Sequence, residues 1–236
     1  MKTTGVLAAT VSVLAIAMIV WGQADRATTR QDRLIDGFKK TTVASVADAV
    51  DQVVGERGYM DHSMRPVIEG PVVGRAVTTL VRPSTPQEST PPRAVQHAVE
   101  MIEEANPGEV GVIVIEDGLD VAGIGGLMAT TAQVRGMAGM VIDGGVRDVT
   151  EIRAMGLPVY GRSVTPATAV GRYASVAKQI PVTCGGVVVR PGDIIVAGED
   201  GVVRVPQEKA DEQKLVRFVN STMTSKPRVH QYHDGQ

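Results

Sequence analysis

Apolar residues recur with two spacings along the chain, and these spacings predict a series of helices and strands. Valine and alanine at helical spacing predict a helix over Thr42–Val54, with Thr41 or Thr42 as its N-cap. The alternating β-branched residues of Val72–Val81 and the continuous apolar run of Val110–Ile115 predict two strands. Further helices are predicted at Pro91–Ala105, Gly125–Arg135 and Val149–Met155.

The remainder of the pattern is rich in short strands. They are predicted at Met140–Ile142, Pro158–Tyr160, Val187–Val189, Ile194–Ala197 and Val202–Val205. Glycine-containing turns are predicted at Asp143–Gly145, Pro191–Asp193 and Glu199–Gly201. Because helices and strands alternate in the middle of the chain and strands dominate near its end, the pattern predicts one α/β domain with some antiparallel pairing.

The two ends of the chain differ from this central pattern. Lys2 precedes an uncharged segment that ends with small residues near Ala24, as in a secretory signal peptide. An uncleaved membrane anchor through residues 5–21 and an apolar cytosolic N-terminus are the alternatives. A signal peptide would place the domain in the periplasm or outside the cell, and an anchor would hold it at the outer face of the inner membrane. We expect a linker at 25–37, the domain at 38–206, and a C-terminal helix (Gln207–Thr222) and tail at 207–236.

Composition narrows the classes of protein to which this chain can belong. Its 236 residues carry a formal net charge of −2, so the basic excess typical of nucleic-acid proteins is missing. A single cysteine, Cys184, excludes a disulfide framework and a multi-cysteine metal site, and we expect it to be a buried structural thiol. Aromatic residues make up only 3%, which indicates a core of small aliphatic side chains.

The stretch from Gly125 to Asp148 carries the strongest candidate chemistry. Gly125 and Gly126 open a predicted helix, where free backbone N–H groups can receive a carboxylate or phosphate. Arg147 offers a planar fork for a carboxylate or carbonyl oxygen, and Asp148 is a hard ligand suited to Mg²⁺ or Mn²⁺. An ordinary helix start and a surface ion pair are the alternative interpretation.

This stretch resembles the class II (metal-dependent) pyruvate aldolases, the family typified by 4-hydroxy-4-methyl-2-oxoglutarate aldolase. That family also includes the regulator of ribonuclease E activity. The resemblance covers roughly residues 38 to 206 in the family's order. Its segments are Ser45–Asp51, Met64–Pro66, Gly70–Thr78, Pro107–Ile115, Gly136–Asp148, Gly156–Gly161 and Cys184–Pro206.

The resemblance implies a compact α/β/β domain of the swivelling type with mixed sheets, assembled as homotrimers or hexamers. It implies that a substrate carboxylate is bound by Gly125 and Gly126 and by the backbone N–H groups of Leu127 and Met128, which follow them. Arg147 would hold the pyruvyl group, and Asp148 would help to hold Mg²⁺ or Mn²⁺. The implied reaction cleaves a 4-hydroxy-2-oxo acid, or decarboxylates oxaloacetate, through a pyruvate enolate.

One position departs from the family pattern. Family aldolases usually carry Asp or Glu where this chain has Gly126, so a candidate acid–base group is missing. Asp117 and Asp120, which lie upstream, are candidate replacements. The resemblance also implies a second acidic residue from a neighbouring subunit's C-terminal segment; Glu208 and Glu212 are available for it, but the sequence aligns neither. Two functions therefore stay open: a metal-dependent lyase, and a non-catalytic oligomer that binds a small carboxylate or a protein. A regulator of a cytosolic ribonuclease is disfavoured by the leader, and we expect His62 to be a solvated loop histidine.

Overall fold

The structure is a computed structural model that describes residues 34–209, 215 and 221. The predicted leader of residues 1–24, most of the linker, and all but a few residues of the predicted C-terminal helix and tail lie outside these residues. Within the described part of the chain, no helix is long and apolar enough to cross a membrane. The chain divides into units of residues 1–37 and 38–236, and every element named below belongs to the second unit.

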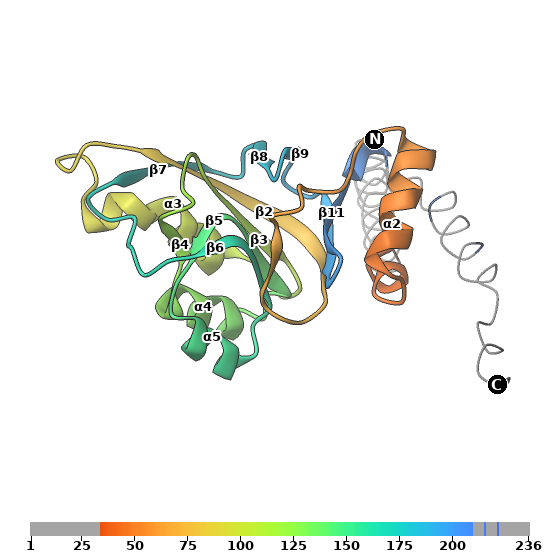
Figure 1. Cartoon of the computed structure of the whole chain (residues 1–236), viewed down its shortest axis with the longest axis horizontal. Coiled ribbons are helices and arrows are strands. Elements are labelled where there is room, and N and C mark those ends of the chain that lie inside the picture. The colour runs from red at the N-terminus through yellow and green to blue at the C-terminus, as the bar shows by residue number, and fades with distance from the viewer. Residues whose placement is uncertain (1–33, 210–214, 216–220, 222–236) are drawn as a thin grey trace, which may run out of the picture. The chain divides into compact units, whose positions relative to one another are not determined.

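A nine-stranded mixed sheet organises this unit (Figure 1). Its order is β1-β6-β5-β3-β2-β10-β11, with β4 beside β5 and β7 beside β2. The strands are β1 (Arg65–Ile68), β2 (Val72–Pro83), β3 (Val110–Ile115), β4 (Ala122–Ile124), β5 (Gly139–Val146), β6 (Val159–Val164), β7 (Tyr173–Lys178), β10 (Ile194–Gly198) and β11 (Gly201–Val205). Neighbours among β2, β3, β5 and β6 pair in parallel, whereas β1, β7 and β10 pair antiparallel to this centre. The predicted α/β class with antiparallel additions is confirmed.

The helices begin close to the predicted residues. Helix α2 (Val43–Ala49) is capped by Thr42, whose hydroxyl accepts a hydrogen bond from Ser45 N at 3.2 Å, and it continues as a π-helix over Val50–Val54. The other α-helices are α3 (Pro91–Glu104), α4 (Gly126–Val134) and α5 (Val149–Met155). Of the predicted C-terminal helix, the structure describes a 3₁₀ turn over Gln207–Lys209 and two helical residues, Leu215 and Ser221; the others lie outside the described part.

Two hydrophobic clusters lie on opposite faces of the sheet. Alternate residues of β2 and β3 separate them: Val77 and Ile113 pack with α3, α4 and α5, whereas Ala76 and Val112 face the other way. That second face is covered by a hairpin of β8 (Val182–Cys184) and β9 (Val187–Val189) and by residues near Met60. Valine, isoleucine and alanine supply most of both clusters, as the low aromatic content predicts.

Tyr160 is the large exception in this aliphatic core. Its side chain is 1% exposed, and its hydroxyl donates to the Gly70 carbonyl at 2.7 Å. Burial raises the pKa of Tyr160 to about 12. The phenol is therefore a neutral packing group that satisfies its own polar atom.

The structure corrects the prediction of a turn at Asp143–Gly145. These residues belong to β5, which runs on to Val146 with a register irregularity opposite β6. A Cβ atom at Gly145 would lie 2.4 Å from the Thr165 side chain, so glycine is required here for close packing. Strands β1, β4 and β7 were not predicted either, because they are short or lack a clear alternation.

Candidate functional site

The end of β5 lies beside the beginning of α4. The Arg147 backbone N–H donates to the Ile124 carbonyl at 3.1 Å, so the chain leaving β5 is held against the chain leaving β4. The Asp148 carboxylate then accepts a hydrogen bond from Gly126 N, with Oδ2 at 2.8 Å. The structure thus brings together the two predicted halves of the site, which are 22 residues apart in sequence.

The two glycines at this point have different roles. A Cβ atom at Gly125 would lie 2.7 Å from Asp148 Oδ2 and 2.8 Å from Arg147 Nε, so glycine leaves the space that both side chains occupy. At Gly126 the same atom would make ordinary contacts, 3.6 Å from Asp148 Oδ2 and 4.0 Å from Glu151 Cβ. Space therefore requires glycine at 125 but not at 126.

Backbone donors at the start of α4 are available to a ligand. Ala129 N is the first amide of this helix to bond within it, to the Gly125 carbonyl at 3.0 Å. Gly126 N is taken by Asp148, whereas Leu127 N and Met128 N have no acceptor within the described residues. The Leu127 side chain is 88% exposed, so solvent reaches this end of the helix. Two adjacent N–H groups at a helix N-terminus favour an anion.

Arg147 and Asp148 are close but are not locked together. Arg147 Nε lies 3.7 Å from Asp148 Oδ2, and the two side chains are 41% and 44% exposed. Asp148 adopts left-handed backbone angles, φ 54° and ψ 38°, which are unusual for a residue other than glycine. Because the Gly126 N–H accounts for one carboxylate oxygen, Oδ1 is left without a hydrogen-bond partner among the described residues. The pair therefore presents one open carboxylate oxygen and one open guanidinium.

A small apolar cavity adjoins the guanidinium. It measures about 40 Å³, close to the volume of one water molecule or methyl group, and of the described residues that line it only Arg147 is charged. Its other walls come from α3, β3, β4 and the Thr168–Ala169 segment. A ligand held by Arg147 would thus find an apolar recess beside its polar group.

The described residues offer a sparse metal site. They contain no group of three or more histidine, cysteine or acidic side chains that could hold an ion. Asp148 alone, with its open Oδ1, fits the habit of Mg²⁺, which keeps several waters and binds proteins through one or two carboxylates. The available donors therefore fit a weakly held, largely hydrated Mg²⁺ or Mn²⁺ rather than a closed protein cage.

The candidate replacements for the missing acid do not reach Asp148 by direct contact. Asp117 and Asp120 contact Tyr173 and Thr165 through their backbone carbonyls, and neither carboxylate pairs with Arg147 or Asp148. Glu208 is exposed, and Glu212 lies outside the described residues. Glu151, whose Cβ would contact a side chain at position 126, was missed at the sequence level because it reads as an ordinary first-turn helix acid.

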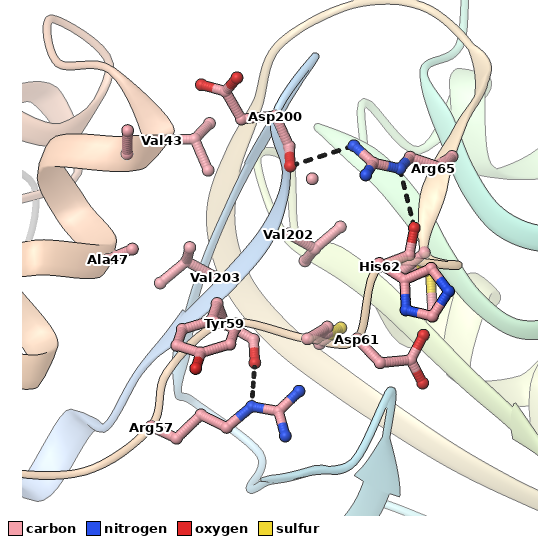
Figure 2. A pocket seen from close by; sticks show the side chains of 14 residues that line it. Val43, Ala47, Arg57, Tyr59, Asp61, His62, Arg65, Asp200, Val202 and Val203 are labelled. Atoms are coloured by element: carbon pink, nitrogen blue, oxygen red, sulfur yellow. Dashed lines mark hydrogen bonds between the residues drawn. The ribbon is translucent and has the colours of Figure 1, made fainter.

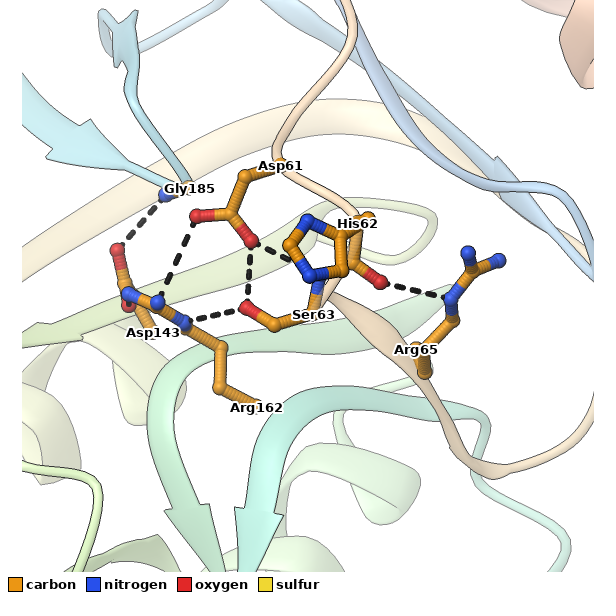
Figure 3. A network of polar contacts seen from close by, with 7 residues as sticks. All are labelled: Asp61, His62, Ser63, Arg65, Asp143, Arg162 and Gly185. Carbon is orange, nitrogen blue, oxygen red and sulfur yellow. Dashed lines mark hydrogen bonds and ion pairs between the residues drawn. The ribbon is translucent and has the colours of Figure 1, made fainter.

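A second polar network near the same strand was also missed (Figure 3). Asp143 accepts hydrogen bonds from Gly185 N at 2.7 Å and from Arg162 Nη1 at 3.0 Å. Arg162 Nε donates to the Ser63 hydroxyl at 2.7 Å, and Arg162 Nη2 lies 3.5 Å from Asp61. The network joins four distant segments of the chain, so no local spacing in the sequence could indicate it.

Electrostatics in this network follow from burial and hydrogen bonding. Hydrogen bonds from Ser63 lower the pKa of Asp61 below its ordinary value. Burial by itself would lower the pKa of Arg162, but the hydrogen bond and charge of Asp143 outweigh it and raise that pKa. Burial raises the pKa of Cys184, and the expectation that this thiol is buried is confirmed. The expectation of an exposed loop position for His62 is confirmed as well.

Several known proteins are similar to this chain in sequence. The model of the family described as "RraA-like: Aldolase/RraA" matches residues 43–204. A Halalkalibacterium halodurans protein named "Putative 4-hydroxy-4-methyl-2-oxoglutarate aldolase" is 32% identical over 154 residues, which are 60% of this chain and 70% of that protein. A 4-hydroxy-4-methyl-2-oxoglutarate aldolase of Thermus thermophilus is 31% identical over 107 residues, 45% of this chain and 65% of that protein.

Solved structures give the same picture. Streptomyces coelicolor RraAS2, described as an unusual member of the RNase ES inhibitor RraA family, has a TM-score of 0.69 and 27% identity, covering 81% of this chain and 91% of that one. An uncharacterized Pseudomonas syringae protein has a TM-score of 0.70 and 26% identity, with coverage of 82% and 88%. The fold is therefore shared with proteins whose names point to two different activities.

Proposed function

Because the chain belongs to the RraA-like family, with relatives named as aldolases, we propose that it is a divalent-metal-dependent carbon–carbon lyase. Its substrate is a 4-hydroxy-2-oxo acid or oxaloacetate, and its product is pyruvate. The observation that carries the proposal is the convergence of Arg147, Asp148 and two free N–H groups of α4 at one solvent-accessible point.

Each group at this point has a task that suits its chemistry. The N–H groups of Leu127 and Met128 hold the substrate carboxylate at the positive end of α4. Arg147 donates to the 2-oxo oxygen, where negative charge develops as the pyruvate enolate forms. Because Gly125 has no Cβ atom, it leaves the space that the Arg147 and Asp148 side chains occupy. Binding and transition-state stabilisation thus share one arginine.

Asp148 would hold the metal ion through its open carboxylate oxygen, while Gly126 N fixes the other oxygen. A bound Mg²⁺ or Mn²⁺ supplies a Lewis acid for the enolate oxygen. The Gly126–Asp148 hydrogen bond orients the carboxylate before any ion arrives, which limits the rearrangement that binding requires.

A non-catalytic carboxylate- or protein-binding oligomer is the second candidate. It is favoured by Gly126, which leaves no carboxylate on the helix start, and by the family's inclusion of proteins described as ribonuclease inhibitors. The same arginine and N–H groups would then hold a small acid without cleaving it.

We also propose a homotrimer or hexamer in which a neighbouring subunit's C-terminal segment contributes an acidic residue to the site. The proposal is supported by the lack of a second carboxylate in contact with Arg147 or Asp148 among the described residues. We propose, too, that the protein is exported, with residues 1–24 either removed or kept as an anchor. This part of the proposal rests on the sequence alone.

Pyruvate release decides between the two functions. We expect purified protein to form pyruvate from 4-hydroxy-4-methyl-2-oxoglutarate or oxaloacetate with Mg²⁺ or Mn²⁺, and EDTA to abolish the reaction. If an intact oligomer forms no pyruvate with any divalent ion, the lyase proposal fails and binding of pyruvate, measured by calorimetry, tests the second candidate. Gly126→Asp fits the available space and should raise the rate if the missing acid limits it, with Gly126→Asn as its uncharged control.

A further inference from the structure

A second cleft lies away from the Arg147 site, between α2, the segment that leads into β1, and β11 (Figure 2). Its volume is about 470 Å³, within the range of cavities that bind small organic molecules. None of its lining residues belongs to the cavity beside Arg147. It is therefore a separate candidate binding site.

The floor of this cleft is apolar. Val43 and Ala47 face it from α2, and Val202 and Val203 face it from β11 (Figure 2). Tyr59 stands at one side and is 47% exposed, so an aromatic surface is available beside the floor. A ligand body of carbon atoms would be shielded from water along this surface.

Two arginines, on opposite sides of the cleft (Figure 2), are fixed in place but not neutralised. Arg57 Nε donates to the Tyr59 carbonyl at 3.0 Å, and its guanidinium lies 4.7 Å from the centre of that ring. Arg65 donates to the His62 carbonyl at 2.8 Å and to the Asp200 carbonyl at 3.3 Å. Carbonyl oxygens orient a guanidinium without cancelling its charge, and within the described part of the chain neither arginine forms an ion pair.

The carboxylates that line the cleft do not offset this charge. Asp61 is already engaged by Ser63 and by Arg162, whose Nη2 lies at 3.5 Å. Asp200 meets Arg65 through its backbone carbonyl, and among the described residues its carboxylate forms no ion pair with either arginine. Positive charge thus remains beside an apolar surface.

We propose that this cleft binds an organic carboxylate whose apolar body is about the size of one ring. Arg57, on the Tyr59 side of the cleft, holds the carboxylate, and the body lies on the valine floor beside Tyr59. The site is independent of the proposed lyase activity, because its residues take no part in the Arg147 site.

Titration of the full-length protein with 4-fluorobenzoate, followed by ¹⁹F NMR, tests this proposal. We expect saturable binding of one molecule per chain, and at least about tenfold weaker binding of the uncharged 4-fluorobenzamide. Absence of saturable binding, or equal binding of the amide, would overturn the proposal.

Variants then locate the bound molecule. Arg57→Ala should weaken binding about tenfold, whereas Arg65→Ala, on the opposite side of the cleft, is the matched control and should not; Ala47→Phe should block the cleft while leaving both charges in place. Arg82→Ala, which removes a paired surface arginine elsewhere, and Arg147→Ala should leave binding unchanged. Loss of binding in Arg147→Ala, with retention in the Arg57 variant, would place the carboxylate at the other site and refute the inference.

Discussion

Two arginine–aspartate pairs lie along the same strand, and they differ in almost every physical respect. Asp143 lies within β5, its side chain is 12% exposed, and it meets Arg162 at 3.0 Å. Asp148 follows the strand, its side chain is 44% exposed, and it lies 3.7 Å from Arg147. The side chains of the first pair are hydrogen-bonded within the protein. Among the described residues, the second pair still has polar atoms that can bind a ligand.

Residue type alone therefore does not separate a structural pair from a functional one. Asp143 accepts from Gly185 N and Arg162, so a ligand would have to break existing bonds to reach it. Among the described residues, Asp148 accepts one hydrogen bond, from a backbone N–H, and its other carboxylate oxygen has no hydrogen-bond donor. Variants of the two pairs should accordingly affect different measurements.

The largest effect is expected from Arg147→Ala. Removing the donor to the developing enolate should lower the rate of pyruvate release by about 10²–10³-fold. Because the side chain is exposed, the melting temperature should change little. A rate close to that of the wild type would remove Arg147 from the reaction.

Arg162→Ala should show the opposite behaviour. It leaves Asp143 with an uncompensated charge in a buried position, at a cost to the unfolding free energy of about 3 kcal/mol, measured by urea denaturation. Arg82→Ala is the matched control, since its partner Glu116 is exposed and the loss should stay below about 1 kcal/mol. Equal losses of unfolding free energy in both variants would show that the network around Arg162 stabilises the protein no more than an exposed ion pair does.

The adjacent glycines provide a finer comparison. Gly125→Ala should displace Arg147 and Asp148 and should lower the unfolding free energy by roughly 1–3 kcal/mol, together with activity. Gly126→Ala should be tolerated, since its Cβ meets nothing closer than 3.6 Å. Paired denaturation and pyruvate assays check both, and similar behaviour of the two variants would contradict the steric argument.

The smallest effect concerns pH. Because the pKa of Asp61 is lowered in the folded protein, its stabilising contribution is present above the unfolded value near 4 and is lost as pH falls through the folded value. Asp61→Asn should therefore lose roughly 1–2 kcal/mol at pH 7 and should match the wild type once acid has protonated Asp61 in the folded protein. Urea denaturation of both proteins from pH 7 into acid measures the two unfolding free energies. A difference between them that persists in acid would rule out ionisation of Asp61 as its cause.

Much of the fold could be predicted from local pattern. Val110–Ile115 and Val149–Met155 have the predicted bounds, because an unbroken apolar run and a helix closed by Gly156 are unambiguous local signals. The turn predicted at Asp143–Gly145 was wrong, since two glycines there belong to a strand and Gly145 meets a packing demand from Thr165, a distant residue.

Like the fold, the candidate site was predictable where its residues have a local signature in the sequence. Arg147 and Asp148 follow a strand, and Gly125 and Gly126 precede a helix, so each half has a local signature. The Gly126–Asp148 hydrogen bond, the cavity beside Arg147 and the Arg57–Arg65 cleft depend on which elements become neighbours, and side-chain spacing along the chain does not encode this.

Strand β2 also has a consequence for the order of folding. Its first residues pair with β10, as in Val73 with Val196, and its last with β7, so its partners lie roughly 100 positions along the chain. Ribosomal synthesis exposes β2 long before either partner exists, and closing such long loops is slow. Until then only β3 covers its edge, and the nascent chain has a β-branched segment in need of protection from other chains.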